Sequence, residues 1–166
     1  MVRDATIQGS VQARLWLRLG AELVVEPWTA DDCATIARST QDAAGRRLAD
    51  VGVDGALSLR ADGADLCRDD LWDRLDGLLL AWLKGIDALS RDADAVTVEF
   101  PDTRIEAKLS QRDDHGTAQL HVAYEDIDAE VPRDALRAAL EAAAQRLVAA
   151  LGPCTPALRE LAARTP

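Results

Sequence analysis

The chain has 166 residues, 48% of them hydrophobic, which is enough for one globular core and excludes a wholly disordered protein. Its formal charge is −10, which argues against binding nucleic acid through the phosphates and against docking on anionic membranes. Such a charge keeps a protein dispersed in solution, and it would also suit a basic protein partner.

The composition points to a core of Leu, Val and Ala, because aromatic residues make up only 4% of the chain. Only two of the 19 basic residues are lysines. Together with the abundant Ala, Asp and Gly, this bias is typical of a GC-rich genome, for example an actinobacterial one. It reflects codon usage and carries no information about function.

The cysteines and the terminal residues indicate a cellular compartment. Cys33, Cys67 and Cys154 are odd in number, widely spaced and without a CxxC pair, so we expect reduced thiols. No run of ~18 apolar residues predicts a membrane span, and Met1 is not followed by the apolar stretch of a signal peptide. We therefore expect a cytoplasmic protein with one domain over residues 1–166, a loose arm at 1–9 and a C-terminal tail at 153–166.

The first elements read as a hairpin followed by a helix. Apolar and polar residues alternate over residues 11–19, which predicts a strand with one solvent-facing side. Residues 23–25 return as a second strand, and Pro27 ends it because proline has no amide hydrogen. A helix is predicted to follow, with the hydroxyl of Thr29 accepting the backbone N–H of Asp32.

That helix is expected to continue to Leu48 and to stop at Gly52. Alternation then returns at residues 56–60 and 65–67, which we interpret as a second hairpin. Asp62 and Gly63 form the turn between its strands.

The clearest helix follows, opened by Asp69 and Asp70. Its apolar residues fall on one stripe about five turns long, namely Leu71, Leu75, Leu78, Leu79, Trp82, Ile86 and Leu89. This spacing predicts the central helix of the core. Asp73 and Asp76 lie off the stripe, so we expect them to face solvent.

Three strands are predicted at residues 96–100, 105–109 and 120–124, and Pro132 opens a last helix that Gly152 and Pro153 end. The order ββα-ββα-βββα predicts a two-layer α+β fold, a mostly antiparallel sheet of about five to seven strands covered by three helices. The layout from the central helix onward resembles that of small actinobacterial proteins. This resemblance includes no diagnostic motif and implies no activity.

Motifs for catalysis, cofactors or metals are missing from the sequence. It has no GxGxxG, GxxxxGK[ST], HExxH or GxSxG pattern, and it contains only two histidines. His115 lies beside Asp113 and Asp114, and a polar turn explains this group more simply than a metal site. The carboxylates at 125–130 lack the spacing of a calcium loop and suggest a solvated acidic edge. We therefore expect no catalytic residue, metal or cofactor.

Two tryptophans stand out. Trp16 falls on the polar side of the first strand between Arg14 and Arg18, and Trp28 follows the strand-ending Pro27. Exposed Trp and Arg are enriched at protein-binding hot spots, so these four residues are candidates for binding a partner. The alternative is that the first helix or the N-terminal arm covers Trp16.

Two functional hypotheses follow. The first is a non-enzymatic protein-binding module, such as an accessory subunit, a regulatory adaptor or an immunity-like protein, with an acidic surface and the Trp/Arg hairpin. The second is a small-molecule-binding or enzymatic domain with a pocket between sheet and helices around His121, Glu106 and Tyr124. Homodimerisation through the edge strand near Trp16 is compatible with both.

Overall fold

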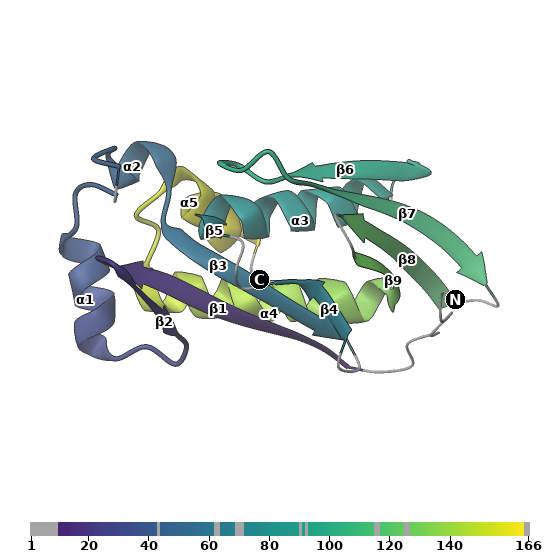
Figure 1. Cartoon of the computed structure of the whole chain (residues 1–166), viewed down its shortest axis with the longest axis horizontal. Coiled ribbons are helices and arrows are strands. Elements are labelled where there is room, and N and C mark those ends of the chain that lie inside the picture. Colours follow the sequence, from purple (N-terminus) through teal and green to yellow (C-terminus); the bar gives the residue numbers. More distant parts are fainter. Residues whose placement is uncertain are drawn as a thin grey trace.

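The computed structural model describes residues 10–42, 44–61, 64–68, 72–89, 91, 93–114, 117–124 and 127–164, with the backbone alone at 112–114, 117–124 and 128. Its elements are arranged as shown in Figure 1. In chain order they are β1 (Val11–Leu19), β2 (Glu22–Val25), α1 (Ala30–Arg38), α2 (Leu48–Val51), β3 (Asp54–Ala61), β4 (Ala64–Cys67), β5 (Trp72–Arg74), α3 (Leu75–Leu89), β6 (Ala95–Glu99), β7 (Glu106–Asp114), β8 (Thr117–Tyr124), β9 (Ile127–Pro132), α4 (Arg133–Leu151) and α5 (Pro156–Arg164).

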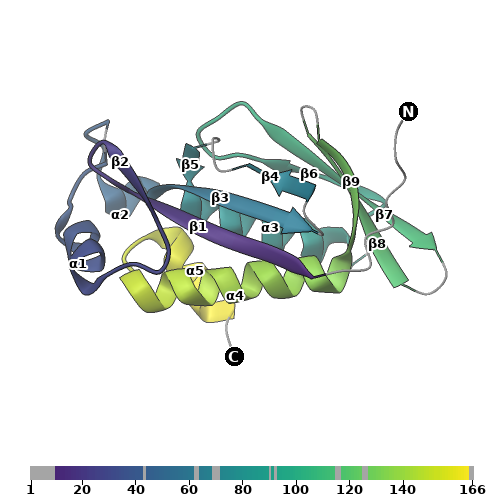
Figure 2. The same ribbon diagram turned by 60° about the horizontal axis from the view of Figure 1, so that its bottom comes forward.

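The strands form two antiparallel sheets. The first has the order β2-β1-β3-β4, and β5 also pairs with β3; the second has the order β6-β7-β8-β9. Helix α3 contacts β3, β6 and β7, whereas α4 contacts β1, β8 and β9, so both long helices touch both sheets. The second sheet lies at the opposite end of the molecule from β2 and α1 (Figures 1 and 2).

The predicted α+β class, with a mostly antiparallel sheet covered by helices, is confirmed. Four elements add to the predicted order: α2, β5, β9 and α5. Strand β9 occupies most of the stretch predicted as a solvated acidic edge. Its apolar residues Ile127, Ala129 and Val131 alternate with acidic ones, and Val131 is buried. The density of acidic residues led the sequence analysis to interpret this stretch as a solvated edge and not as an alternating strand.

The first helix begins as predicted and ends earlier than predicted. Thr29 caps it with a reciprocal pair of hydrogen bonds to Asp32, 3.1 Å and 2.9 Å long. The helix stops at Arg38 instead of continuing to Leu48, and Ile36 is its one buried residue. The small or polar residues that follow offer little apolar surface to bury, so packing does not extend the helix. Gly52 ends the short α2 with φ +107°, a conformation that favours glycine.

The prediction of a central buried helix is confirmed. Ten of the 15 residues of α3 are buried, so this helix is enclosed on most of its sides and not along one stripe only. Gly85 allows the close approach of β6, because a Cβ there would lie 2.8 Å from a methyl group of Val98. The helix begins at Leu75, since the residues just before it form β5. The predicted Leu71 lies outside the described residues.

The prediction that Asp73 and Asp76 face solvent is wrong, because they are 3% and 0% exposed. The Asp76 carboxylate accepts the backbone N–H of Val53 at 3.0 Å and the hydroxyl of Thr155. That hydroxyl in turn accepts the backbone N–H of Leu158 at 3.1 Å, in the first turn of α5. One carboxylate therefore joins the start of α3 to the entry of β3 and to α5. Helical periodicity separates polar from apolar residues, and it cannot detect a polar residue that is buried with its partners.

The remaining predictions concern the two ends of the chain and the cysteines. Residues 1–9, predicted as a loose arm, lie outside the described residues. Within the predicted C-terminal tail, α5 buries Leu158 and Leu161 against the core. The three cysteines are free thiols. No helix in the described part of the chain is both long and apolar enough to cross a membrane.

Replacing Thr155 by Val should lower the free energy of unfolding by about 2 kcal/mol, because a buried carboxylate loses one of its donors. Urea denaturation of the two proteins measures this difference. Thr97→Val is the matched control, because Thr97 is exposed on β6 and its substitution should change stability little. Equal stability of the Thr155 variant and the unmodified protein would contradict this structural role.

Candidate functional site

The first sheet has one face toward the helices and one face turned away from them. Leu15 and Leu17 of β1 and Leu57 and Leu59 of β3 point to the helices and are completely buried. Side chains alternate along a strand, so the residues between them share the opposite face. We call this second side the outer face. On β1 it carries Arg14, Trp16 and Arg18.

Two indole rings cross the middle of the outer face. Ala56 pairs with Trp16 on one side and with Trp72 on the other, and paired residues in antiparallel strands share a face. Ala56 is 0% exposed, although it lies on the side away from the helices. The Arg18 guanidinium lies over the Trp72 ring, 4.5 Å from its centre, and its Nε donates to the Gly20 carbonyl at 3.0 Å. These contacts hold the Trp72 ring in place.

A groove of about 750 Å³ begins beside Trp16 and runs along β1 to α4. Figure 2 shows β1 crossing above α4 and approaching it toward the N-terminal end of the strand. The lining comes from β1, β3, the β4 region and α4, and consists of Val11, Gln12, Ala13, Arg14, Trp16, Ser58, Arg60, Asp65, Arg68, Ala139, Ala142 and Arg146. Its volume lies within the range of roughly 300–1,000 Å³ that is usual for ligand sites.

The groove is basic in an acidic protein. Among the residues that the structure describes, four arginines and one aspartate line it, a surplus of three positive charges, whereas the whole chain carries −10. Arg60 pairs with Asp65 at 2.9 Å. Hydrogen bonds to Glu26, at 2.8 and 2.9 Å, raise the pKa of Arg146. Arg14 is exposed and forms no ion pair with any residue that the structure describes.

The predicted partner-binding residues separate into three groups. Arg14 and Trp16 line the groove, whereas Arg18 lies beside it, against Trp72. Trp28 is elsewhere: its indole N–H donates to the Val24 carbonyl at 2.9 Å, and its side chain packs against the core. The binding candidates on this sheet are therefore Arg14 and Trp16, with Arg18 as a support.

The alternative pocket cannot be assembled from the described side chains. Glu106 is exposed on β7 and does not line the groove. His121 pairs with Ser110 and Tyr124 with Ile127 in the backbone of β8, and the side chains of His121 and Tyr124 lie outside the described residues. The pocket around these three residues stays a prediction.

Sequence reasoning missed Arg60, Arg68 and Arg146. The alternation at residues 56–60 places Arg60 on the polar side of its strand, but a single sequence does not show which strand pairs with β1. Arg146 lies off the apolar stripe of α4, where an arginine is indistinguishable from an ordinary surface residue. The strand pairing and helix packing bring these side chains to one groove.

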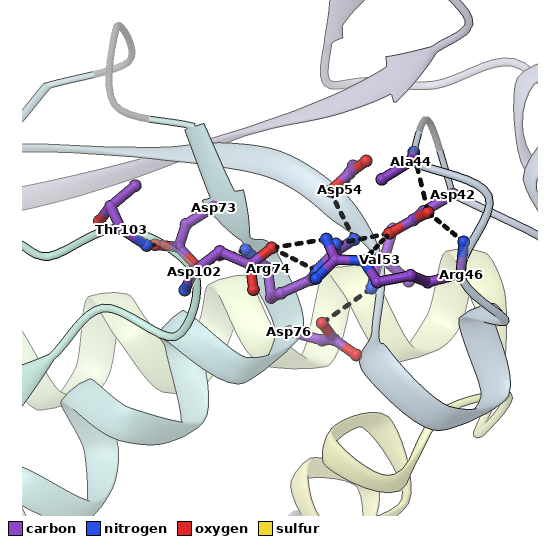
Figure 3. Close-up of polar contacts among 10 residues, drawn as sticks. All are labelled: Asp42, Ala44, Arg46, Val53, Asp54, Asp73, Arg74, Asp76, Asp102 and Thr103. Atoms are coloured by element: carbon purple, nitrogen blue, oxygen red, sulfur yellow. Dashed lines mark hydrogen bonds and ion pairs between the residues drawn. The ribbon is translucent and has the colours of Figure 1, made fainter.

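A second polar cluster surrounds Arg74, which is 2% exposed (Figure 3). Its guanidinium contacts the carboxylates of Asp42 at 2.5 Å, Asp54 at 2.6 Å and Asp102 at 2.7 Å. The neighbouring Asp73 accepts the backbone N–H groups of Asp102 and Thr103 at 2.8 and 3.1 Å. The cluster ties three segments together: the loop after α1, the start of β3 and the turn after β6. Because its charged groups engage one another, we assign it to the architecture and not to chemistry.

Four carboxylates have shifted pKa values, two of them raised and two lowered; Asp42, Asp73 and Asp76 lie in or beside the Arg74 cluster, and Asp87 lies on α3. Burial raises the pKa of Asp73 and of Asp76, and the hydrogen bonds that each accepts offset only part of this effect. Burial also acts on Asp42 and Asp87, but hydrogen bonds from arginines outweigh it and leave both pKa values lowered. These arginines are Arg46 at Asp42, and Arg164 and Arg137 at Asp87.

The raised pKa values predict that mild acid stabilises the fold. A folded-state pKa above the ordinary value of 3.8 means that the folded protein binds the proton more tightly than the unfolded chain. Stability from Asp73 and Asp76 is therefore lost as pH rises through their folded pKa values. As the pH is lowered from neutrality toward 3.8, the free energy of unfolding should increase, and it should fall at still lower pH as Asp42 and Asp87 lose their ion pairs.

Urea denaturation across this pH range tests the expectation. Asp76→Asn should flatten the increase, since the amide can accept the N–H of Val53 and donate to the Thr155 hydroxyl. Asp94→Asn, at an exposed position, is the control and should leave the profile unchanged. An unmodified protein that loses stability steadily from pH 7 downward would contradict this account.

Neither a group of metal ligands nor a similar protein identifies the function of the groove. Among the described residues, no group of three or more His, Cys, Asp and Glu side chains is arranged to hold a metal ion. No protein-family model matches the chain, and no curated protein or solved structure matches it either. Function has to be inferred from the groove itself.

Proposed function

We propose that this protein is a non-enzymatic protein-binding module that holds an acidic segment of its partner in the groove beside Trp16. The observation that supports this most is the gathering of Arg14, Arg60, Arg68 and Arg146 around one hollow in a chain of net charge −10. An adaptor, an accessory subunit or an immunity-like inhibitor would each use such a surface.

Charge complementarity selects the sign of the bound segment. Carboxylates form bidentate, charge-assisted hydrogen bonds with guanidinium groups, and arginine matches their geometry better than lysine does. The exposed Arg14 is available for such a contact, while Asp65 and Glu26 partly neutralise Arg60 and Arg146. Screening limits the field of exposed charges to ~10 Å at ordinary ionic strength, so the groove can differ in sign from the rest of the surface.

The overall charge adds a second condition on the partner. A chain of net charge −10 repels acidic proteins at long range and attracts basic ones. We therefore propose a partner that is basic over much of its surface and presents one acidic segment to the groove. The negative net charge of the chain would repel proteins that are acidic throughout, even though the positive groove attracts acidic segments.

The groove is also organised before binding. Asp65 holds Arg60, Glu26 holds Arg146, and Trp16 packs beside the completely buried Ala56. Side chains that are already ordered lose less conformational entropy when a partner arrives. Trp and Arg are the residues most enriched at binding hot spots. Arg14 and Trp16 are therefore the positions at which we expect substitution to weaken binding most.

Selection from a displayed library of random peptides tests the proposal without knowledge of the natural partner. Peptides retained by the immobilised protein should be enriched in Asp and Glu. For one retained peptide, Arg14→Glu should weaken binding at least tenfold, or about 1.4 kcal/mol, because repulsion replaces an ion pair. Isothermal titration measures this change.

Arg91→Glu is the matched control, because it makes the same change in net charge at an exposed position outside the groove. It should leave the affinity within twofold. Enrichment of basic peptides, or an equal loss with both variants, would overturn the proposal. Thermal melting of each variant confirms that the fold is retained.

A further inference from the structure

We infer that the partner's acidic segment binds as an extended strand along the open edge of β1, an inference that rests on the proposed function. Strand β2 pairs with β1 from Trp16 to Leu19 only. Over residues 11–15, no strand in the described part of the chain pairs with this edge of β1. An open edge presents backbone N–H and C=O groups that an incoming strand can pair with.

The groove extends from the outer face of the sheet around the edge of β1. Val11 and Ala13 belong to the side of β1 that faces the helices, whereas Gln12, Arg14 and Trp16 belong to the outer face. Residues of both sides line the same hollow. Only a hollow that runs along the edge of a strand can contact both of its sides, so an added strand would occupy this space.

The backbone groups on the open edge of β1 show how far an added strand could pair with it. Both backbone groups of Leu15 are engaged by Glu26: its carboxylate accepts the Leu15 N–H at 3.1 Å, and its N–H donates to the Leu15 carbonyl at 3.0 Å. The Ala13 carbonyl accepts Nη2 of Arg146 at 2.9 Å. The N–H and C=O of one residue point to the same side of an antiparallel strand, so the Ala13 N–H points into the groove as well.

The lining predicts the pattern of the bound segment. Toward the outer face, an added strand would lie next to Arg14, whereas Arg60 and Arg68 lie beyond β1, on the β3 and β4 side of the same hollow, and add to its positive charge. Toward α4 the added strand would meet Ala139 and Ala142, whose small side chains leave room beside β1. Because side chains alternate along a strand, the segment should alternate acidic residues with apolar ones.

A second copy of this chain fits the edge less well. Two β1 strands paired antiparallel would bring the arginines of one copy against those of the other, and like charges on facing strands are destabilising. We therefore assign the edge to a partner segment. Homodimerisation is one outcome that the experiment must detect, and analytical ultracentrifugation measures it directly.

The probe is a synthetic peptide of four Glu-Val repeats, acetylated and amidated, titrated into the full-length protein. Two matched peptides accompany it: one with all glutamates before all valines, and one with the alternating sequence N-methylated at every backbone amide. The block peptide keeps the composition and changes the pattern. The methylated peptide keeps the side chains and loses the backbone donors that pair with a neighbouring strand.

Strand addition predicts that the alternating peptide binds at least tenfold more tightly than either matched peptide. It also predicts that saturating peptide slows hydrogen exchange at the Ala13 amide at least tenfold, measured by NMR of the isotope-labelled protein. Equal binding of all three peptides, with loss on Arg14→Glu, would overturn strand addition and leave the acidic-segment function standing. Binding that is insensitive to Arg14→Glu would count against the proposed function itself.

A pair of α4 variants gives a second, independent readout. Ala142→Phe fills the groove from the helix without altering the arginines, and it should weaken the alternating peptide at least tenfold. Ala149→Phe is the control, since Ala149 is exposed on the same helix and does not line the groove. Failure of the alternating peptide to bind, equal affinities of the two variants, or a protein that is dimeric through this edge would each overturn the inference.

Discussion

The guanidinium of Arg74 carries its charge at a position with almost no solvent, and the surrounding segments are arranged to compensate for it. Removing one partner of a buried ion pair costs on the order of 3–5 kcal/mol, because the remaining charge is left without compensation. Asp42, Asp54 and Asp102 come from three separate segments. Each segment must therefore be placed so that its carboxylate reaches the Arg74 guanidinium. The cluster thereby fixes the first sheet against the turn that follows β6.

This arrangement also decides which part of the outer face stays open. The loop after α1 is held by Asp42 and lies over one end of the outer face, next to Asp54 and Arg74. The two indoles of Trp16 and Trp72 occupy the middle. The remaining end is the groove beside the open edge of β1. The proposed binding groove thus begins on the part of the outer face that the protein's own polar network leaves uncovered.

The separation of charge gives the groove its chemistry. Averaged over the chain, the charge argues for a basic partner and against an anionic one. The local surplus of arginine argues for an acidic segment, because short-range contacts depend on the nearest side chains and not on the net charge. The net charge acts at long range and the groove arginines act at contact distance, so both conditions apply to the same proposed protein partner.

The sequence by itself determined the local elements with strong periodicity or clear capping: β1, the Thr29 cap, the buried α3, and the start and end of α4. These depend on residues within a few positions of one another, where side-chain spacing and backbone geometry dictate the outcome. It also placed Arg14, Trp16 and Arg18 on one polar side of a strand. Only the tertiary structure decided that Trp16 and Trp72 flank Ala56, that Arg60 and Arg146 join Arg14, and that Asp73 and Asp76 are buried. Those facts depend on which distant segments pair and which charges find partners, and a pattern of local polarity does not encode either one.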